Sequence, residues 1–125
     1  MAAETSRAVY VVEPLVVARR VATPVAEIEV VVPSDLRYFD GHFPGAPVVP
    51  GVVQIKWALE FARRYLDVGG GFAGLERLKF QQLMTPGTRA TLTLEHAAAA
   101  HKVQFSFASA DARYSSGRLL LRAPQ

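Results

Sequence analysis

Apolar and polar residues alternate in two segments of the second half of the chain, from Thr91 to Glu95 and from Val103 to Phe107. Successive side chains of a β-strand point to opposite faces of the sheet, so a period of two predicts a strand with one buried face. β-branched and aromatic residues between turn signals such as Pro86-Gly87 extend this prediction to neighbouring segments. The strands expected in this half cover residues 75–83, 90–96, 103–108 and 113–122, with a bulge at 115–117.

The first third of the chain predicts two further strands. Residues 9–17 are rich in β-branched side chains, but Pro14 cannot donate to a sheet ladder, which indicates an edge or interrupted strand. Residues 21–32 alternate between apolar and other positions and predict a longer strand. Pro33 ends this strand, and residues 34–51 then form an ordered loop whose length is typical of functional loops in compact domains.

Between residue 52 and about residue 67, apolar residues recur at steps of three and four, which predicts one amphipathic helix. Gly69, Gly70 and Gly71 follow and are expected to end it, since glycine favours the left-handed conformation of a helix C-terminus. The apolar stripe consists of Val52, Ile55, Leu59, Ala62 and Leu66, widened by Val53, Trp57 and Phe61.

A single helix with a broad apolar face among five or six strands predicts an α+β fold in which an antiparallel sheet wraps around the helix. A chain of 125 residues is long enough for one core and too short for two ordinary domains. We therefore expect a single domain over residues 1–125, in which the small and polar residues 1–7 have no fixed structure.

Half of the residues are apolar and a fifth are charged, which is the balance of a soluble globular protein. The absence of cysteine excludes disulfides and thiolate metal sites and fits a reducing compartment. The apolar runs are far shorter than the ~20 residues of a membrane span, and no signal peptide is apparent, so a cytoplasmic location is expected. The net charge of +3 comes with scattered arginines and no interleaved aromatic residues, which argues against nucleic acid and suits an acidic protein partner.

The richest chemical signal is the segment from Gly41 to Val52, which combines His42 with three prolines and three glycines. Proline fixes φ and glycine permits backbone conformations closed to other residues, so this segment predicts a loop held in one shape. Pro50-Gly51 then opens the helix, whose first N–H groups and positive dipole end suit a carbonyl oxygen. A histidine beside such donors indicates proton transfer next to a thioester or ester.

This segment resembles the signature of the hotdog-fold 3-hydroxyacyl-acyl-carrier-protein dehydratases. Its first block consists of Gly41-His42-Phe43-Pro44-Gly45, Pro47-Val48 and Pro50-Gly51-Val52. A second block, similar to a strand and turn of that family, consists of Leu78-Lys79-Phe80, Pro86-Gly87 and Thr91-Leu92. The run from Pro50 to Ile55 followed by Trp57-Ala58 is most similar to the variant dehydratases of aryl polyene-type bacterial pathways.

The resemblance implies a homodimer, or a higher oligomer, with each active site at the interface of two hotdog subunits. The ligand would be an acyl thioester of acyl carrier protein or coenzyme A, without cofactor or metal. The implied reaction eliminates water to give a 2-enoyl thioester in bacterial fatty-acid or polyene-type lipid synthesis. His42 would be the base, and N–H groups around Gly51 and Val52 would bind the thioester oxygen. The side chains expected to contact substrate are Phe43, Pro50, Trp57 and Phe80.

One catalytic position departs from the family. Lys56 replaces the acid that follows Pro-Gly-Val in these dehydratases, and Glu60 replaces a glutamine one turn later. Residues at i and i+4 share a helix face, so the two side chains are expected to be neighbours. Either Glu60 acts as the acid, or Lys56 donates the proton with a pKa lowered by burial, or the site is inactive. Helix periodicity taken alone favours another interpretation, a solvated face of ion pairs.

Two other functions fit the same ligand. A catalytically impaired chain would bind acyl thioesters or act as partner subunit of an active dehydratase, and a hotdog thioesterase would hydrolyse the thioester. The Lys56–Glu60 pair is the feature that separates these functions. His96 and His101 bracket a turn and lack a carboxylate cluster at ligand spacing, so no metal site is expected.

Overall fold

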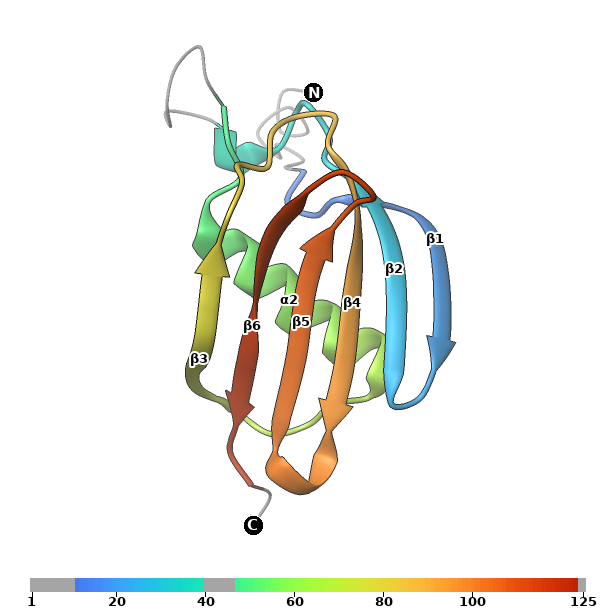
Figure 1. The fold of residues 1–125 in the computed structure, drawn as a ribbon, viewed down its shortest axis with the longest axis vertical. Coiled ribbons are helices and arrows are strands. Elements are labelled where there is room, and N and C mark those ends of the chain that lie inside the picture. The colour runs from blue at the N-terminus through green and yellow to red at the C-terminus, as the bar shows by residue number, and fades with distance from the viewer. Residues whose placement is uncertain (1–10, 40–46, 124–125) are drawn as a thin grey trace, which may run out of the picture.

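A six-stranded antiparallel sheet and one long helix make up most of the part of the chain that the computed structural model describes, residues 11–39 and 47–123. The strand order is β1-β2-β4-β5-β6-β3, so β1 and β3 form the two edges of the sheet (Figure 1). The elements are β1 Leu15–Ala22, β2 Val25–Val31, the 3-10 turn η1 Arg37–Phe39, α2 Gly51–Leu66, β3 Phe72–Phe80, β4 Arg89–Ala97, the 3-10 turn η2 Ala98–Ala100, β5 Lys102–Ala108 and β6 Arg113–Leu121. The expectation for residues 1–7 lies outside the described residues.

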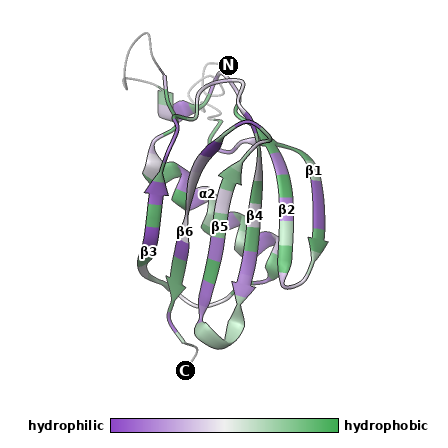
Figure 2. Ribbon diagram, viewed as in Figure 1, coloured by the Kyte–Doolittle hydropathy of each residue, from purple (hydrophilic) through white to green (hydrophobic). Residues whose placement is uncertain are grey.

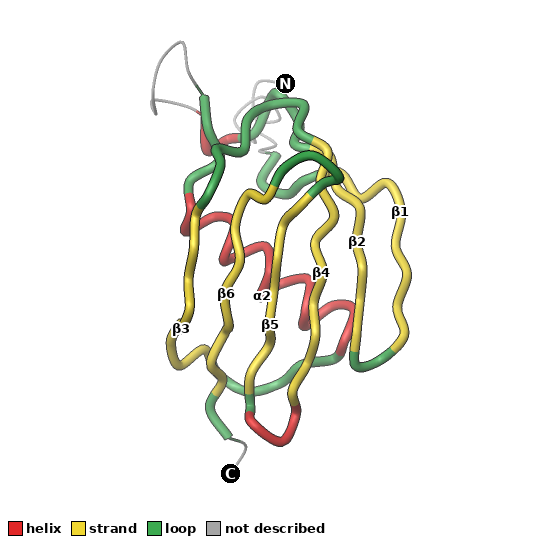
Figure 3. Tube along the Cα trace, in the orientation of Figure 1, coloured by secondary structure: helices red, strands yellow, loops and turns green. Residues whose placement is uncertain are grey.

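Helix α2 lies against one face of the sheet and crosses behind the strands in the view of Figures 1 and 3. The sheet and the helix share one core, in which Trp57 and Phe61 of the helix are fully buried. The register brings inward residues of neighbouring strands opposite one another, as with Leu94, which pairs with Ala26 on one side and Phe105 on the other. Hydrophobic and hydrophilic residues alternate along the central strands (Figure 2), so the sheet buries one face as the sequence pattern predicts.

The two N-terminal strands differ from the prediction. β1 runs through Arg19 and Arg20, and Pro24 lies in the turn that joins it to β2. Proline has no N–H for the ladder, so Pro24 separates two strands instead of lying within one. The expected break before residue 21 is absent because β1 is an edge strand with mostly exposed side chains, where arginines remain hydrated. Val11 forms only an isolated bridge, to Leu36.

The C-terminal strands are confirmed. β4, β5 and β6 begin and end within one residue of the predicted bounds, and only β3 lies three residues earlier than expected. Phe72 already pairs with Leu121 of β6, and the chain leaves the sheet after Phe80. Propensity alone does not place these ends, because pairing with a neighbour determines where a strand stops.

The bulge predicted at residues 115–117 is displaced, because β6 carries one extra residue between Arg113 and Ser115, where its register with β5 shifts. Gly117 pairs regularly with Phe105 of β5, while β3 carries one extra residue between positions 76 and 79. A Cβ atom on Gly117 would lie 3.0 Å from the Phe105 ring and 3.2 Å from the Leu78 side chain. Glycine is therefore needed at this position for close packing of its neighbours, not for an irregular backbone.

Helix α2 covers the predicted range, but the glycines do not end it. Asp67 adopts the left-handed conformation directly after Leu66, with φ of 52°. Asp and Asn tolerate this conformation better than most side chains, so the helix can end before Gly69 is reached. No helix among residues 11–39 and 47–123 is long and apolar enough to cross a membrane.

The buried face of α2 is rotated relative to the predicted stripe. It centres on Trp57 and Phe61, whereas Ile55 and Leu59 are only half-buried and Val52 is 72% exposed. Large aromatic side chains remove the most apolar area from water, so they take the positions against the sheet. Ile55 and Leu59 therefore pack at the margin of the core, and Val52 is the large apolar side chain of α2 that is exposed.

Candidate active site

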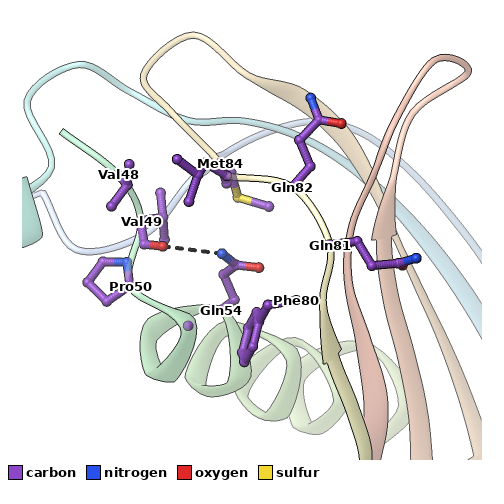
Figure 4. A pocket seen from close by; sticks show the side chains of 10 residues that line it. Val48, Val49, Pro50, Gln54, Phe80, Gln81, Gln82 and Met84 are labelled. Carbon is purple, nitrogen blue, oxygen red and sulfur yellow. Dashed lines mark hydrogen bonds between the residues drawn. The ribbon is translucent and has the colours of Figure 1, made fainter. Parts of the chain in front are cut away.

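A cavity of about 430 Å³ opens at the N-terminal end of α2 (Figure 4). Residues 48–51, which lead into the helix, form one wall, and residues 80–84, which follow β3, form the other. The walls are joined by a backbone hydrogen bond of 2.8 Å from the Val49 N–H to the Met84 carbonyl. Gln54 of the first helical turn also lines the cavity. The cavity therefore depends on contacts between segments about thirty residues apart in the sequence.

The first turn of α2 leaves backbone donors at this cavity. The Pro50 carbonyl accepts the N–H groups of Val53 and Gln54 over 3.0 and 3.2 Å. The N–H groups of Gly51 and Val52 have no acceptor within the helix, as in the first turn of any α-helix, and Pro50 provides no capping side chain. Because the positive end of the helix dipole lies here, a carbonyl oxygen that gains negative charge would be stabilised.

The ring of Phe80 packs on Gly51. A Cβ atom at Gly51 would lie 2.5 Å from Cζ of Phe80, so this approach requires glycine. The Phe80 side chain is nevertheless 50% exposed, because it lies at the end of edge strand β3. Of the residues expected to contact substrate, the structure thus brings Pro50, Gly51 and Phe80 to one cavity.

Two polar side chains that sequence reasoning missed are buried in the described part of the chain. Gln54 is 3% exposed and Ser115 is 2% exposed. Nε2 of Gln54 donates to the Val49 carbonyl over 3.2 Å, as Figure 4 shows. Oε1 of Gln54 and Oγ of Ser115 are enclosed and have no hydrogen-bond partner among the described residues. The sequence could have indicated the burial of Gln54, because it lies three residues before Trp57 and therefore on the same helix face.

Lys56 is exposed, and its ammonium group donates a hydrogen bond of 3.2 Å to the hydroxyl of Tyr38 in η1. This bond, followed by the charge interactions with Tyr38 and Glu60, raises the pKa of Lys56 above its ordinary value. In this subunit burial contributes less than these interactions, so the pKa of Lys56 is raised and not lowered. Lys56 remains a cation at neutral pH, and Tyr38, which sequence reasoning also missed, orients it.

Glu60 and Trp57 have different environments on α2. Glu60 is half-buried and close enough to Lys56 for their charges to interact, as the i to i+4 spacing predicts. Trp57 is fully buried, and its indole N–H donates to the Val12 carbonyl over 2.9 Å. Trp57 is therefore a core residue of this subunit and does not line the cavity, contrary to its expected contact with substrate.

The solvated-face interpretation describes the rest of the outer side of α2. Arg63 and Arg64 are exposed, and Arg64 forms a salt bridge of 2.9 Å with Glu13 of the N-terminal segment. Such exposed pairs contribute little to stability. Within one subunit, this side of the helix is therefore an ordinary charged surface.

His42 and Phe43 belong to residues 40–46, which lie outside the described residues, so their roles stay predictions. The flanking residues are described on both sides. Tyr38 contacts Lys56 of α2, and Val48 lines the cavity. The segment that contains His42 therefore starts and ends beside the first two turns of the helix.

The other two histidines lie at the opposite end of the sheet. His96 is near the end of β4, and His101 directly follows η2 with φ of 54°. Residues 11–39 and 47–123 contain no group of three His, Cys, Asp or Glu side chains that could hold a metal ion. Neither histidine lines the cavity at the start of α2.

Comparison with known proteins places this arrangement in a family. The model of the ApeI-like family, described as ApeI dehydratase, matches residues 18–118. A chain of the dehydratase heterocomplex ApeI:P from Xenorhabdus doucetiae is 31% identical, with a TM-score of 0.82 over 89% of this chain and 99% of that chain. An uncharacterized protein from Erwinia carotovora subsp. atroseptica is also 31% identical, with a TM-score of 0.74 over 87% of this chain and 95% of that chain.

Curated relatives match over a shorter stretch. The 3-hydroxyacyl-[acyl-carrier-protein] dehydratase FabZ of Erythrobacter litoralis is 37% identical over 67 residues, which are 46% of this chain and 44% of the relative. The FabZ of Syntrophomonas wolfei is 35% identical over 68 residues, 49% of this chain and 47% of the relative. The chain therefore spans about half the length of these curated relatives. The structural matches confirm the hotdog fold, and because the family model spans all of α2 and most of the sheet, the chain belongs to the ApeI-like dehydratase family.

Proposed function

We propose that this protein eliminates water from 3-hydroxyacyl thioesters of acyl carrier protein or coenzyme A, giving 2-enoyl thioesters for bacterial fatty-acid or polyene-type lipid synthesis. One observation supports this most directly. The cavity is lined by Gly51, the first residue of α2, and by Val48, which closely follows the segment that contains His42. Preorganised N–H groups stabilise a developing oxyanion, and histidine transfers protons near neutral pH.

In the proposed reaction, the thioester oxygen accepts hydrogen bonds from the N–H groups of Gly51 and Val52. The neutral imidazole of His42 takes the proton from C2, and the electron pair of that bond forms the double bond between C2 and C3. The bond from C3 to oxygen breaks, and the departing hydroxyl takes a proton from Glu60 and leaves as water. His42 and Glu60 come from different subunits of a dimer, and solvent returns the proton from His42 to Glu60 before the next turnover.

Glu60 suits the role of acid better than Lys56. The ammonium group of Lys56 is held by Tyr38, and its raised pKa makes proton donation less favourable. Glu60 is half-buried one turn further along the same helix. We assign Glu60 as the proton donor and Lys56 as a positioned cation beside it.

The activity test uses a 3-hydroxyacyl thioester of pantetheine and follows the absorbance of the enoyl product. Wild-type protein is expected to form this product, and Glu60→Gln is expected to lower kcat by about 10²- to 10⁴-fold with thioester binding retained, since the amide keeps the shape but has no acidic proton. Glu95→Gln is the matched control, because Glu95 is an exposed carboxylate of β4, and it should leave kcat unchanged. Full turnover in Glu60→Gln would exclude Glu60 as the acid. If the wild type forms no enoyl product and Lys56→Glu does, the natural site is inactive because it lacks an acid at position 56.

A second subunit is part of the proposal, since His42 and Glu60 are taken from different chains. The outer edge of β3 pairs with no strand among the described residues. Phe72 and Leu78 of this strand are 40% and 37% exposed, and Val52 of α2 is 72% exposed. Large apolar side chains along an unpaired edge are typical of an assembly surface. We assign the β3 edge as the subunit interface in preference to the equally apolar β1 edge, because β3 ends at the cavity beside the start of α2.

Phe72→Asp tests this interface. A carboxylate that must be desolvated on assembly is expected to raise the Kd of the dimer at least about tenfold and to lower turnover in parallel. Val21→Asp is the matched control, because Val21 is 42% exposed on the opposite edge strand, β1. Light scattering during size-exclusion chromatography reports the mass of each variant. A Phe72→Asp protein that remains dimeric at the same concentration would rule out the β3 edge.

A non-catalytic partner subunit is the second candidate function. Lys56 stands where the dehydratases carry their acid, and the relative from Xenorhabdus doucetiae is a chain of a dehydratase heterocomplex. In this case the chain would pair with a hotdog subunit that supplies the carboxylate. The enoyl assay distinguishes the two, because such a chain is inactive alone and active after mixing with its partner. A thioesterase would instead release free thiol, which a thiol reagent detects in the same reaction.

A further inference from the structure

The two buried polar atoms without partners lie at the same end of the fold. Ser115 pairs with Phe80 in the β3–β6 ladder and with Phe107 in the β5–β6 ladder. Residues paired in this way point to the same face of the sheet, so Ser115 lies beside Phe80 on the side that α2 covers. The ring of Phe80 packs on Gly51, and Gln54 follows one turn later with its amide oxygen on the β3 side of the cavity (Figure 4).

The donor and acceptor properties of these two atoms define which ligand group could form their missing hydrogen bonds. The amide of Gln54 is oriented by its Nε2, which donates to the Val49 carbonyl, so Oε1 is left as a pure acceptor. The Ser115 hydroxyl can donate as well as accept. Enclosed polar atoms without partners are unfavourable and uncommon in folded proteins. A hydroxyl group matches the chemistry of both atoms, because it can donate to Gln54 and accept from Ser115.

We propose that Gln54 and Ser115 bind the 3-hydroxyl group of the acyl thioester and select 3-hydroxyacyl chains over saturated ones. This rests on the proposed function, in which the thioester oxygen lies at Gly51. The second lone pair of the hydroxyl oxygen stays open for the acid. Rotation of the half-exposed Phe80 ring away from Gly51 gives the ligand access.

The test compares ligands that differ only in this hydroxyl, 3-hydroxyhexanoyl-pantetheine and hexanoyl-pantetheine, with pantetheine alone as a third ligand. Calorimetry gives each Kd in a His42→Ala background, which prevents turnover. The hydroxylated ligand is expected to bind about 5- to 100-fold more tightly than the saturated one. Gln54→Met keeps the side-chain length and removes the acceptor, so it should bring this ratio close to one. Ser115→Ala should also reduce the ratio, and it leaves the helix unchanged should Gln54→Met fail to fold.

Gln82→Met is the matched control. Gln82 lines the same cavity with an exposed side chain that points away from Gln54 in Figure 4, so this variant should keep the wild-type ratio. If the protein that retains Gln54 binds the saturated and the hydroxylated ligand with nearly equal Kd values, water satisfies both atoms and the proposal is overturned. A ratio that persists in both Gln54→Met and Ser115→Ala would also overturn it. Weaker binding of pantetheine alone to Gln54→Met would assign the acceptor to a pantetheine amide and overturn the hydroxyl assignment.

Failure of this proposal is distinct from failure of the proposed function. The binding ratio is measured without turnover, so an inactive wild type leaves the ratio test intact. Conversely, a wild type that forms enoyl product but shows no preference for the hydroxylated ligand keeps the dehydratase assignment. In that outcome only the role of Gln54 and Ser115 is lost.

Discussion

Replacing His42 by alanine is expected to lower kcat for enoyl formation by about 10²- to 10⁴-fold, the usual contribution of a positioned general base. Alanine removes the imidazole that takes the C2 proton but leaves the backbone donors of Gly51 and Val52 in place. The Kd for the thioester should therefore change little while kcat falls. Steady-state kinetics with a 3-hydroxyacyl-pantetheine thioester, together with calorimetry of binding, separates the two effects.

The control for this experiment is His96→Ala. His96 lies near the end of β4, away from the start of α2, and its replacement should leave kcat and binding unchanged. Equal losses in both variants would point to a general effect on folding. Undiminished turnover in His42→Ala would exclude His42 as the base and with it the proposed mechanism.

The largest effect on stability is expected at Trp57. Trp57→Ala should lower the free energy of unfolding by about 3–5 kcal/mol, because it leaves a cavity between α2 and the sheet. The Val12 carbonyl also loses the indole N–H that donates to it over 2.9 Å. Urea denaturation at one fixed protein concentration measures this change, since assembly makes stability depend on concentration.

Leu15→Ala is the control for Trp57→Ala. Leu15 is 59% exposed on β1, so its truncation should change the free energy of unfolding by less than about 0.5 kcal/mol. Trp57→Phe should lie between the two variants, because it keeps an aromatic ring in the core but removes the hydrogen bond to Val12. A Trp57→Ala protein as stable as Leu15→Ala would contradict the placement of Trp57 in the core.

Regular periodicity was sufficient to predict most of the elements. The strands β4 and β5 follow from alternation, because a period of two in hydrophobicity leaves little choice when one face is buried. The predictions were wrong at Pro24, which was expected within a strand but lies in a turn, and at the glycines after Asp67, which were expected to end the helix. Strand ends depend on the neighbouring strand and helix ends on local backbone conformation, neither of which periodicity reports.

The candidate site was predictable in part. Gly51 and Phe80 were expected from separate motifs, and the structure brings them into contact at one cavity. Trp57 was assigned to substrate from its place in the motif, but its side chain points into the core and not into the cavity. Gln54 and Ser115 carry no motif, so only their burial and their lack of partners identify them.

By itself, the sequence determined the hotdog-type order of strands and helix and the proline- and glycine-rich segment around His42, because both are encoded in local pattern and composition. The tertiary structure decided which helix face is buried: Trp57 and Phe61 are fully buried against the sheet, whereas Ile55 and Leu59 are only half-buried. It also decided that Lys56 contacts Tyr38 and that Gln54 and Ser115 are enclosed at the same end of the fold. These contacts join residues far apart in the chain, and their energies depend on burial that no local pattern specifies.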